Sequence, residues 1–253
     1  MIPICCDLDG VVWRGESEIP GSSGAIDALR AAGHRVVFVT NNSSLTVGDY
    51  LAKLRRVGID AVSDDLLTSA KAAAHLLRSQ LPAGAPVLAC AGPGVREALA
   101  AQGFVVVDVL PADAVVVGWH RTFDFARMTT AADAVRAGAR FVATNLDPTY
   151  PDESGVVPGA GAIVAAVATA GGRSPDAVAG KPEAAMAALV LDRVGRDETG
   201  IMIGDRQSTD GAFATRLGWP FAFVQSGIAG DDAPTPPAYV AADLAALVPQ
   251  LLG

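Results

Sequence analysis

Short apolar runs bounded by turn residues alternate along the chain with longer segments whose apolar positions recur three or four residues apart. The short runs are typical of buried strands, and the longer segments, such as the one containing Val47, Tyr50 and Leu54, are typical of helices. The predicted strands are residues 2–6, 35–39, 87–91, 104–109, 114–119, 140–144, 199–203 and 220–224. The predicted helices are residues 22–32, 46–57, 67–78, 95–102, 125–137, 158–170, 182–194, 211–216 and 241–247. This alternation favours an α/β fold with a doubly wound parallel sheet.

Turn-forming residues gather at Leu81-Pro82-Ala83-Gly84-Ala85-Pro86, between two of the predicted α/β stretches. Such a shift in composition is typical of a domain boundary. The last third of the chain then returns to the strand and helix pattern of the first third. We therefore expect a discontinuous core domain of residues 1–81 and 179–253, interrupted by an inserted α/β domain of residues 82–178.

Composition narrows the class of protein. With 253 residues, 51% of them hydrophobic and 18% charged, the chain can bury a sizeable core, which excludes a disordered chain. The net charge of −8 argues against nucleic acid as a partner. The mean hydropathy is +0.35, but no apolar stretch reaches the roughly 20 residues that a membrane span needs. No basic region or cleavage site precedes the first strand, so we expect a cytoplasmic protein with no membrane partner.

Cysteines are few, and their spacing suits neither a disulfide framework nor a metal site. The chain has three, Cys5, Cys6 and Cys90. Cys5 and Cys6 lie in the apolar run that ends at Asp7. We expect them to be buried strand thiols, because free cysteine is among the most buried residue types.

Two carboxylates, Asp7 and Asp9, follow the first predicted strand, with Leu8 between them and Gly10 after them. Ligands of open parallel sheets bind outside the carboxyl ends of the strands, where both acids are expected. Side chains alternate along extended chain, so Asp7 and Asp9 share one face. Two acids so close repel each other unless a cation joins them. Taken alone, the motif has a solvated turn as its alternative interpretation.

Polar residues also follow the second predicted strand, at Thr40, Asn41 and Asn42. The Thr40 hydroxyl and the backbone N–H groups can bind phosphate oxygens near the N-terminus of the next helix. Simple helix capping is the alternative for these three residues.

Two later segments end in charged residues. Lys181 stands just before a predicted helix, and a surface lysine with a solvated head is its alternative interpretation. Asp205 ends the strand at 199–203 and Asp210 follows it, where a turn and an N-cap are the alternative. Polar or charged residues at the ends of four separate segments are improbable by chance alone. This favours one site built from all four segments.

Together these segments resemble the haloacid dehalogenase-like (HAD) phosphatase superfamily. The matching motifs are DLDGVVW, VTNNSS, GKPEAAM and MIGDRQSTD, in the order of the superfamily. PGAGAIVAAV in the inserted segment and Ser226-Gly227-Ile228 after the last core strand extend the resemblance over essentially the whole chain. The chain is most similar to subfamily IIA, which includes NagD-type, p-nitrophenyl phosphate, phosphoglycolate and pyridoxal phosphate phosphatases. The implied fold is a Rossmann-like HAD core with a large inserted α/β (C2-type) cap.

The resemblance implies a Mg²⁺-dependent phosphomonoesterase. Asp7 would attack phosphorus to form an aspartyl-phosphate, while Asp9 would protonate the leaving group and later deprotonate water. Mg²⁺ would bind the carboxylates of Asp7 and Asp205 and the backbone carbonyl of Asp9. Asp210 would support Lys181 or the waters of the metal. The residues expected to bind the phosphate are Gly10, Thr40, Asn41, Asn42 and Lys181.

The cap would select the substrate, because the core recognises only the phosphate. Asn145 and Asp147, after a predicted cap strand, are the candidate substrate contacts, with a polar turn as the alternative. His120 stands where relatives commonly carry Asp. We expect His120 on the cap surface rather than as an essential base, because Asp9 already fills the acid–base role.

The implied partner is a small-molecule phosphate ester. Phosphoglycolate, glycerol phosphate and a sugar phosphate are the first candidates, with p-nitrophenyl phosphate as an artificial substrate; pyridoxal phosphate and a nucleotide stay open. A phosphotransferase or mutase of the same superfamily is one alternative function. A phospho-receiver module is another, although it needs only one small domain and has no use for Asp9. The resemblance also implies that a homodimer can form through the cap.

Overall fold

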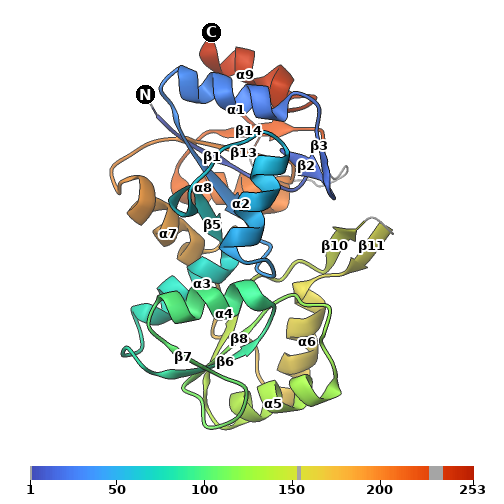
Figure 1. Ribbon diagram of the computed structural model, residues 1–253. Helices are drawn as coiled ribbons and strands as arrows, with labels where there is room; N and C mark the ends of the chain where they lie inside the picture. The colour runs from blue at the N-terminus through green and yellow to red at the C-terminus, as the bar shows by residue number, and fades with distance from the viewer. Residues whose placement is uncertain (1, 153–154, 228–235) are drawn as a thin grey trace. The chain divides into compact units, whose positions relative to one another are not determined.

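The computed structural model describes residues 2–152, 155–227 and 236–253. The chain divides into two compact units (Figure 1). The first unit comprises Met1–Thr40, Val47–Leu67 and Lys181–Gly253, and the second comprises Asn41–Thr46 and Thr68–Gly180. Both are α/β units with their own sheet. Ile228, part of one motif noted above, lies outside the described residues.

A six-stranded sheet in the order β15-β14-β13-β1-β4-β5 forms the centre of the first unit. Its strands are β1 (Pro3–Cys6), β4 (Arg35–Thr40), β5 (Leu66–Thr68), β13 (Ile201–Gly204), β14 (Phe221–Val224) and β15 (Tyr239–Ala241). β1 pairs in parallel with both β4 and β13, and every residue of β1 and β13 is buried. Continuous apolar runs are what a parallel sheet covered on both faces requires.

Helices and short turns complete the first unit. The helices are α1 (Ser22–Ala31), α2 (Val47–Arg56), α7 (Ala184–Val194), α8 (Ala212–Leu217) and α9 (Leu244–Leu252). A hairpin of β2 (Trp13–Arg14) and β3 (Ser17–Glu18), a 3₁₀ turn at Ser63–Asp65 and a π-helical turn at Gln207–Gly211 join them. α1 and α9 pack side by side, as Figure 1 shows.

The second unit contains a five-stranded parallel sheet in the order β12-β9-β8-β6-β7. Its strands are β6 (Pro86–Cys90), β7 (Val105–Val107), β8 (Ala114–Val117), β9 (Arg140–Ala143) and β12 (Ala177–Val178). Its helices are α3 (Ser69–Arg78), α4 (Pro93–Ala101), α5 (Phe125–Arg136) and α6 (Ala160–Gly171), and β10 (Thr149–Asp152) and β11 (Gly155–Pro158) form an antiparallel hairpin. Alternate strand residues such as Leu88, Val115 and Phe141 join α5 and α6 in one apolar cluster.

A doubly wound parallel α/β fold is confirmed, and several predicted element bounds need correction. Leu67 was predicted to begin a helix, but it lies in β5, and the helix starts at Ser69 after the Thr68 side chain accepts a hydrogen bond from Lys71 N. The C-terminal helix predicted at 241–247 spans Leu244–Leu252, because the Asp243 side chain caps it. The strands of both hairpins, β12 and β15 were not predicted.

The division into units does not fall at the boundary expected at residues 81 and 82, and residues 41–46, expected in the core domain, belong to the second unit. The observed division falls before α3, because α3 packs against α4 of the second unit. The last division along the chain, between Gly180 and Lys181, lies close to the one expected at residues 178 and 179. Among the described residues no helix is both long and apolar enough to cross a membrane.

The three cysteines are free and buried, which confirms the expectation of strand thiols for Cys5 and Cys6. Burial raises the pKa of Cys5 to about 12. Burial likewise raises the pKa of Cys90, at the end of β6, to about 12. The thiols therefore stay protonated and unreactive at neutral pH.

Candidate active site

Two acids of the first unit stand at the carboxyl ends of neighbouring parallel strands. Asp7 follows β1 and Asp205 follows β13, and Asp7 N donates a hydrogen bond of 2.9 Å to Ile203 O. From β1 the chain proceeds to β4 and β5 on one side of the sheet and later returns to β13 on the other. The acids thus lie where the strand order reverses, the position at which doubly wound sheets bind their ligands.

Three carboxylates meet there. One oxygen from each of Asp7, Asp205 and Asp210 lies within 4.8 Å of the others, and all three residues are buried. Asp210 comes from the π-helical turn after β13, where its Oδ2 accepts a hydrogen bond of 3.1 Å from Arg206 N. Lys181 Nζ lies 2.8 Å from Asp7 Oδ1 and 2.7 Å from Asp210 Oδ1. Three acids against one ammonium leave an excess of negative charge in a buried space.

The pKa values of Asp7 and Lys181 are shifted by this burial and by the charges close to them. Burial raises the pKa of Asp7 well above its ordinary value, and Lys181 only partly opposes that effect. Burial alone would lower the pKa of Lys181, but Asp210 and Asp7 outweigh it and raise that pKa. The lysine is therefore a permanent cation.

Asp9 has a different environment from the three clustered acids. Its Oδ1 accepts a hydrogen bond of 3.0 Å from Trp13 Nε1, and its side chain is not one of the three clustered carboxylates. Lys53 Nζ lies 4.4 Å from the centre of the Trp13 ring. Burial raises the pKa of Asp9, while Lys53 and the Trp13 hydrogen bond oppose that rise. Trp13 therefore orients this carboxyl group, a role that the sequence reasoning missed.

Three glycines allow the backbone to lie directly against the carboxylates of Asp205 and Asp210. A Cβ atom on Gly10 or on Gly227 would overlap Asp205 Oδ2, and one on Gly204 would overlap Asp210. Ser226 Oγ donates a hydrogen bond of 2.7 Å to Gly10 O, which fixes the segment of Gly227 beside the loop after β1. Gly10 was expected to bind the phosphate, and in the structure its backbone packs against Asp205. The roles of Gly204 and Gly227 were not predicted.

The other predicted phosphate-binding residues divide between the units. Thr40 is buried at the end of β4 in the first unit. Asn41 and Asn42 belong to the second unit. Asn42 Oδ1 accepts hydrogen bonds of 3.0 Å from Ser44 N and 2.7 Å from Ser44 Oγ, and Asn42 Nδ2 donates one of 3.1 Å to the Tyr150 hydroxyl. The Asn42 side chain is thus bound within the second unit.

Asn145 and Asp147 contact the segment that follows Thr40. Asn145 Nδ2 donates a hydrogen bond of 2.7 Å to Asn41 O, and Asn41 Nδ2 donates one of 3.2 Å to Asp147 Oδ2. Asn145 Oδ1 also accepts from Asp147 N at 3.0 Å. These two candidate substrate contacts therefore hold the 41–46 segment within the second unit.

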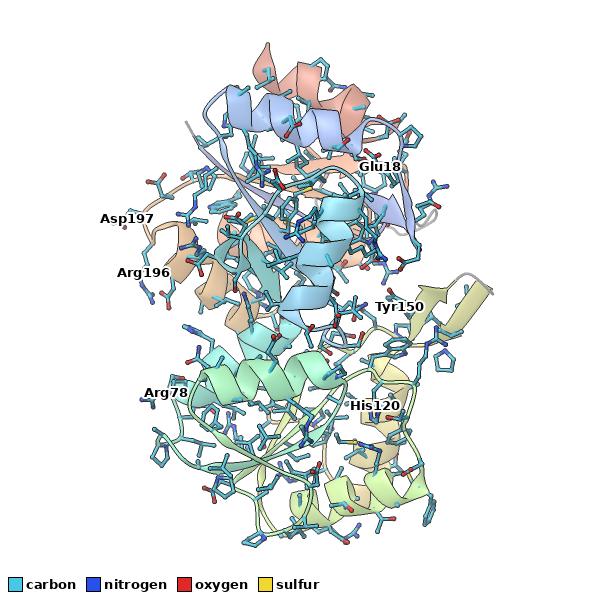
Figure 2. All side chains as sticks on the ribbon, viewed as in Figure 1. Glu18, Arg78, His120, Tyr150, Arg196 and Asp197 are labelled. Carbon is cyan, nitrogen blue, oxygen red and sulfur yellow. The ribbon has the colours of Figure 1, made fainter. Side chains whose placement is uncertain are left out.

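Aromatic and imidazole groups of the second unit depart from the sequence expectation. Tyr150, labelled in Figure 2, packs its ring 4.9 Å from that of Trp119, and no sequence motif marked this pair. His120 was expected on the surface of the cap, which is wrong: it is only 6% exposed. Its ring packs edge-on to Phe123 and lies beside Cys90, and these contacts account for its burial.

Comparison with known proteins places this geometry in a family. A model of haloacid dehalogenase-like hydrolases matches residues 4–105, and a second HAD-hydrolase-like model matches residues 178–247. An acid sugar phosphatase of Staphylococcus aureus (strain USA300) is 35% identical over 250 residues, which is 97% of this chain and 96% of the relative. The chain belongs to the haloacid dehalogenase-like hydrolases.

Further relatives of this HAD hydrolase point to the same group. A D-glycerol 3-phosphate phosphatase of Mycobacterium tuberculosis is 40% identical over 224 residues, which is 88% of this chain. The chain spans only 62% of the length of that relative. A p-nitrophenyl phosphatase from Archaeoglobus fulgidus superposes with a TM-score of 0.90 at 30% identity and 98% coverage of both chains.

A glycerol phosphate phosphatase from M. tuberculosis, in complex with magnesium, superposes with a TM-score of 0.88 at 37% identity. That match covers 96% of this chain and 74% of the other. The HAD hydrolase is thus a phosphatase of the NagD and p-nitrophenyl phosphatase subfamily, IIA. The phospho-receiver alternative is wrong, because the relatives matched along most of the chain are phosphatases.

Proposed function

We propose that this HAD phosphatase is a Mg²⁺-dependent phosphomonoesterase that hydrolyses a small phosphorylated metabolite through an aspartyl-phosphate. The observation that carries the proposal is the meeting of Asp7, Asp205 and Asp210 at the strand-order reversal. Lys181 forms ion pairs with two of them, Asp7 and Asp210. The glycerol phosphate phosphatase from M. tuberculosis, which was solved in complex with magnesium, supports the choice of metal.

The donor set suits a hard divalent cation. Carboxylate oxygens within 4.8 Å of one another can share one ion, and magnesium prefers oxygen ligands. The buried negative excess left after Lys181 calls for a further positive charge. Asp7 and Asp205 would hold the metal together with the backbone carbonyl of Asp9, while Asp210 would hold Lys181. When bound, the metal would neutralise the repulsion between a phosphate dianion and the nucleophile.

Asp7 and Asp9 divide the covalent chemistry in this proposal. An Asp7 oxygen attacks phosphorus, the bond from phosphorus to the ester oxygen breaks, and Asp9 gives its proton to the departing alkoxide. Asp9 then takes a proton from a water whose oxygen attacks the aspartyl-phosphate and releases inorganic phosphate. The Trp13 hydrogen bond supports this dual role, because it fixes the Asp9 carboxyl group in one orientation.

We assign binding of the phosphoryl oxygens to the residues that the sequence motifs indicated. Lys181 and the Thr40 hydroxyl, with backbone groups of Gly10 and the Asn41–Asn42 segment, would take the charge that spreads over the oxygens during transfer. Lys181 is suited to this because it is buried and carries a permanent charge.

Two substrate classes are supported by the named relatives. The D-glycerol 3-phosphate phosphatase, 40% identical to this chain, supports glycerol 3-phosphate as a substrate, although this chain spans 62% of that relative. The acid sugar phosphatase, of which this chain spans 96%, supports a sugar phosphate. Both, with phosphoglycolate, are small hydroxylated phosphate esters, and we propose this class as the physiological substrate. A cytoplasmic location and a homodimer through the cap stay predictions from the sequence.

The first test measures phosphate release from p-nitrophenyl phosphate, glycerol 3-phosphate, a hexose phosphate and phosphoglycolate with and without Mg²⁺. We expect metal-dependent turnover, and a loss of at least about 10³-fold in kcat, or about 4 kcal/mol, for Asp7→Asn, because the amide is no nucleophile. Asp27→Asn, an exposed acid on α1, is the matched control and keeps full activity.

Hydrolysis and transfer give different products in this assay. One inorganic phosphate released per ester consumed, with no phosphorylated acceptor formed, supports hydrolysis over a transferase or mutase. Turnover that is independent of Mg²⁺, or an Asp7→Asn variant as active as its parent, contradicts the proposal.

A further inference from the structure

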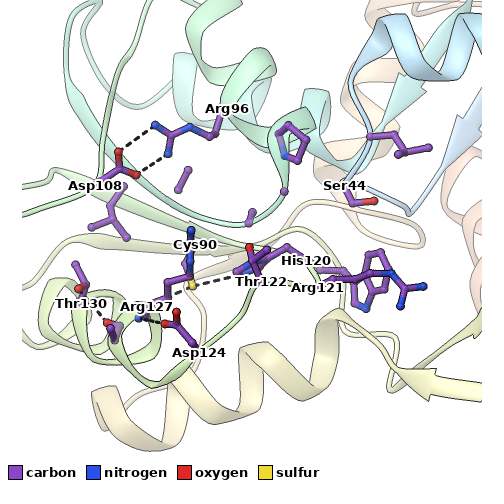
Figure 3. Close-up of a pocket in the computed structure, with 18 residues that line it drawn as sticks. Ser44, Cys90, Arg96, Asp108, His120, Arg121, Thr122, Asp124, Arg127 and Thr130 are labelled. Atoms are coloured by element: carbon purple, nitrogen blue, oxygen red, sulfur yellow. Dashed lines mark hydrogen bonds and ion pairs between the residues drawn. The ribbon is translucent and has the colours of Figure 1, made fainter.

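The second unit contains a pocket of about 810 Å³ that none of the residues discussed above as catalytic or phosphate-binding lines. Figure 3 shows its walls, which come from the 41–46 segment, the end of β6 and the loop after it, α4, the loop after β8 and the start of α5. Apolar lining comes from Leu45, Leu88 and Ala126. The charged residues in the lining are Arg96, Asp108, Arg121, Asp124 and Arg127. This volume suits a ligand of metabolite size.

The position of the pocket follows from strand order. In the second sheet β6 is flanked by β7 on one side and by β8 on the other, so the chain changes direction between β6 and β8. The lining includes Cys90–Gly92, directly after β6, and Trp119–Thr122, directly after β8. The same rule that places Asp7 and Asp205 at the reversal in the first sheet therefore places this pocket at the reversal in the second.

Charge in the lining favours an anionic ligand. Arg96 is already neutralised, because its Nη1 and Nη2 donate to Asp108 at 2.7 and 3.2 Å. Asp124 caps α5 by accepting a hydrogen bond of 2.8 Å from Arg127 N. In contrast, no hydrogen bond or ion pair of the Arg127 guanidinium exists within the described part of the chain. Arg96, Arg121 and Arg127 against Asp108 and Asp124 give the lining an excess of positive charge, in a protein whose net charge is −8.

The floor of the pocket supplies neutral polar groups. His120 is buried there, with Nδ1 at 3.2 Å from Thr122 Oγ1 and Nε2 at 3.9 Å from Cys90 Sγ. Burial lowers the pKa of His120, and the nearby Arg127 charge lowers it further, so the ring stays neutral. A neutral ring beside apolar walls accommodates the body of a ligand rather than a second anion.

We propose that the second unit carries its own ligand site at the β6–β8 reversal, and that it binds a small organic anion. The apolar body lies against Leu45, Leu88 and Ala126, and the anionic group pairs with Arg127. This site is distinct from the phosphatase chemistry, whose covalent steps we assign to Asp7 and Asp9 of the first unit.

Isothermal titration of the full chain in Mg²⁺ buffer tests this site with 2-naphthoate and its neutral analogue 2-naphthamide. Neither probe carries a phosphate, so turnover cannot interfere. We expect one naphthoate per chain and binding at least tenfold weaker for the amide. Arg127→Gln lowers naphthoate affinity at least fivefold, whereas Arg55→Gln, which removes an exposed arginine from α2, leaves it unchanged.

Two more variants locate the bound probe. Ala126→Phe places a ring into the pocket from an exposed position on α5 and abolishes binding without risk to the core. Asp7→Asn leaves naphthoate binding unchanged, which separates this site from the acidic cluster. The proposal is overturned if naphthoate gives no saturable heat, if the amide binds equally well, or if Arg127→Gln and Ala126→Phe bind like their parent.

Discussion

At Gly10, Gly204 and Gly227 the missing side chain is the functional feature. Each backbone segment packs where a methyl group would overlap a carboxylate of Asp205 or Asp210. Gly10 also has φ of +85°, a conformation that other residues rarely adopt. The positions of these acids are thus set by backbone contact as well as by hydrogen bonds.

Gly227→Ala tests that conclusion. The added methyl group must displace the Asp205 carboxylate or the 226–227 segment, so we expect kcat/KM for p-nitrophenyl phosphate to fall at least tenfold, or about 1.4 kcal/mol. The Mg²⁺ concentration needed for half-maximal rate should rise as well.

The matched control is Gly24→Ala. Gly24 lies in α1, and a Cβ there would meet no atom within 4 Å. Alanine is favoured over glycine inside a helix, so this variant should keep its activity and gain up to about 1 kcal/mol in free energy of unfolding. Equal activity of both variants would show that the Gly227 contact has no role in catalysis.

Sequence reasoning found the acids but not their surroundings. Asp7 and Asp205 follow strongly apolar strands, so their approach to each other follows from strand order. Trp13, Gly227 and Tyr150 act through contacts with residues near in space, and such contacts leave no periodic signal. His120 was wrongly predicted to be exposed, because histidine occurs both in cores and on surfaces and its sequence neighbours do not decide between them.

Among the elements, long segments were predictable and short ones were not. α5 and α6 have twelve residues each, enough for several turns of apolar periodicity. β2, β3 and β12 have two residues each, and their pairing depends on neighbours distant in sequence. The boundary of the inserted unit was displaced for a similar reason, since α3 is assigned by its packing on α4.

Asp176 joins the turn that follows α6 to the sheet of the second unit. Its Oδ2 accepts a hydrogen bond of 2.7 Å from Phe141 N in β9, and its Oδ1 pairs with Arg173 at 2.8 Å. Burial alone would raise the pKa of Asp176, but the hydrogen bonds from Arg173 and Phe141 N outweigh it and lower that pKa. The ionised carboxylate therefore stabilises the fold.

We expect Asp176→Asn to lower the free energy of unfolding by about 1 kcal/mol at pH 7, a modest value because the side chain is 31% exposed. A carboxyl group with a lowered pKa stabilises above its unfolded value of about 3.9, and the effect disappears as the pH falls through the folded pKa. The difference between variant and parent should thus be constant from pH 7 to pH 5 and shrink below about pH 4.

Urea unfolding at several pH values measures this difference, with Asp197→Asn, an exposed acid of the first unit, as the control (Figure 2). A deficit that stays constant down to pH 3 would contradict the electrostatic explanation.

For the whole molecule, the distribution of tryptophan allows each unit to be followed separately. Trp13 and Trp219 lie buried in the first unit, and Trp119 lies in the second. Trp119→Phe therefore leaves fluorescence that reports the first unit alone.

In that variant we expect Mg²⁺ to raise the free energy of unfolding of the first unit, because only the folded acids form the site. The increase should be about 2.7 kcal/mol when the metal is at 100 times its dissociation constant. Adding Asp205→Asn should remove most of the increase. An increase of equal size in both proteins would place the metal elsewhere.

The order of synthesis adds a constraint that follows from the central place of β1 in its sheet. β1 pairs with β13, which leaves the ribosome only after the second unit has been made. At about 5–20 residues per second the apolar edge of Ile4, Cys5 and Cys6 waits roughly 10–40 s for its partner. Throughout that interval the nascent chain presents a strand edge open to aggregation, so its folding yield in the cell depends on what covers that edge during translation.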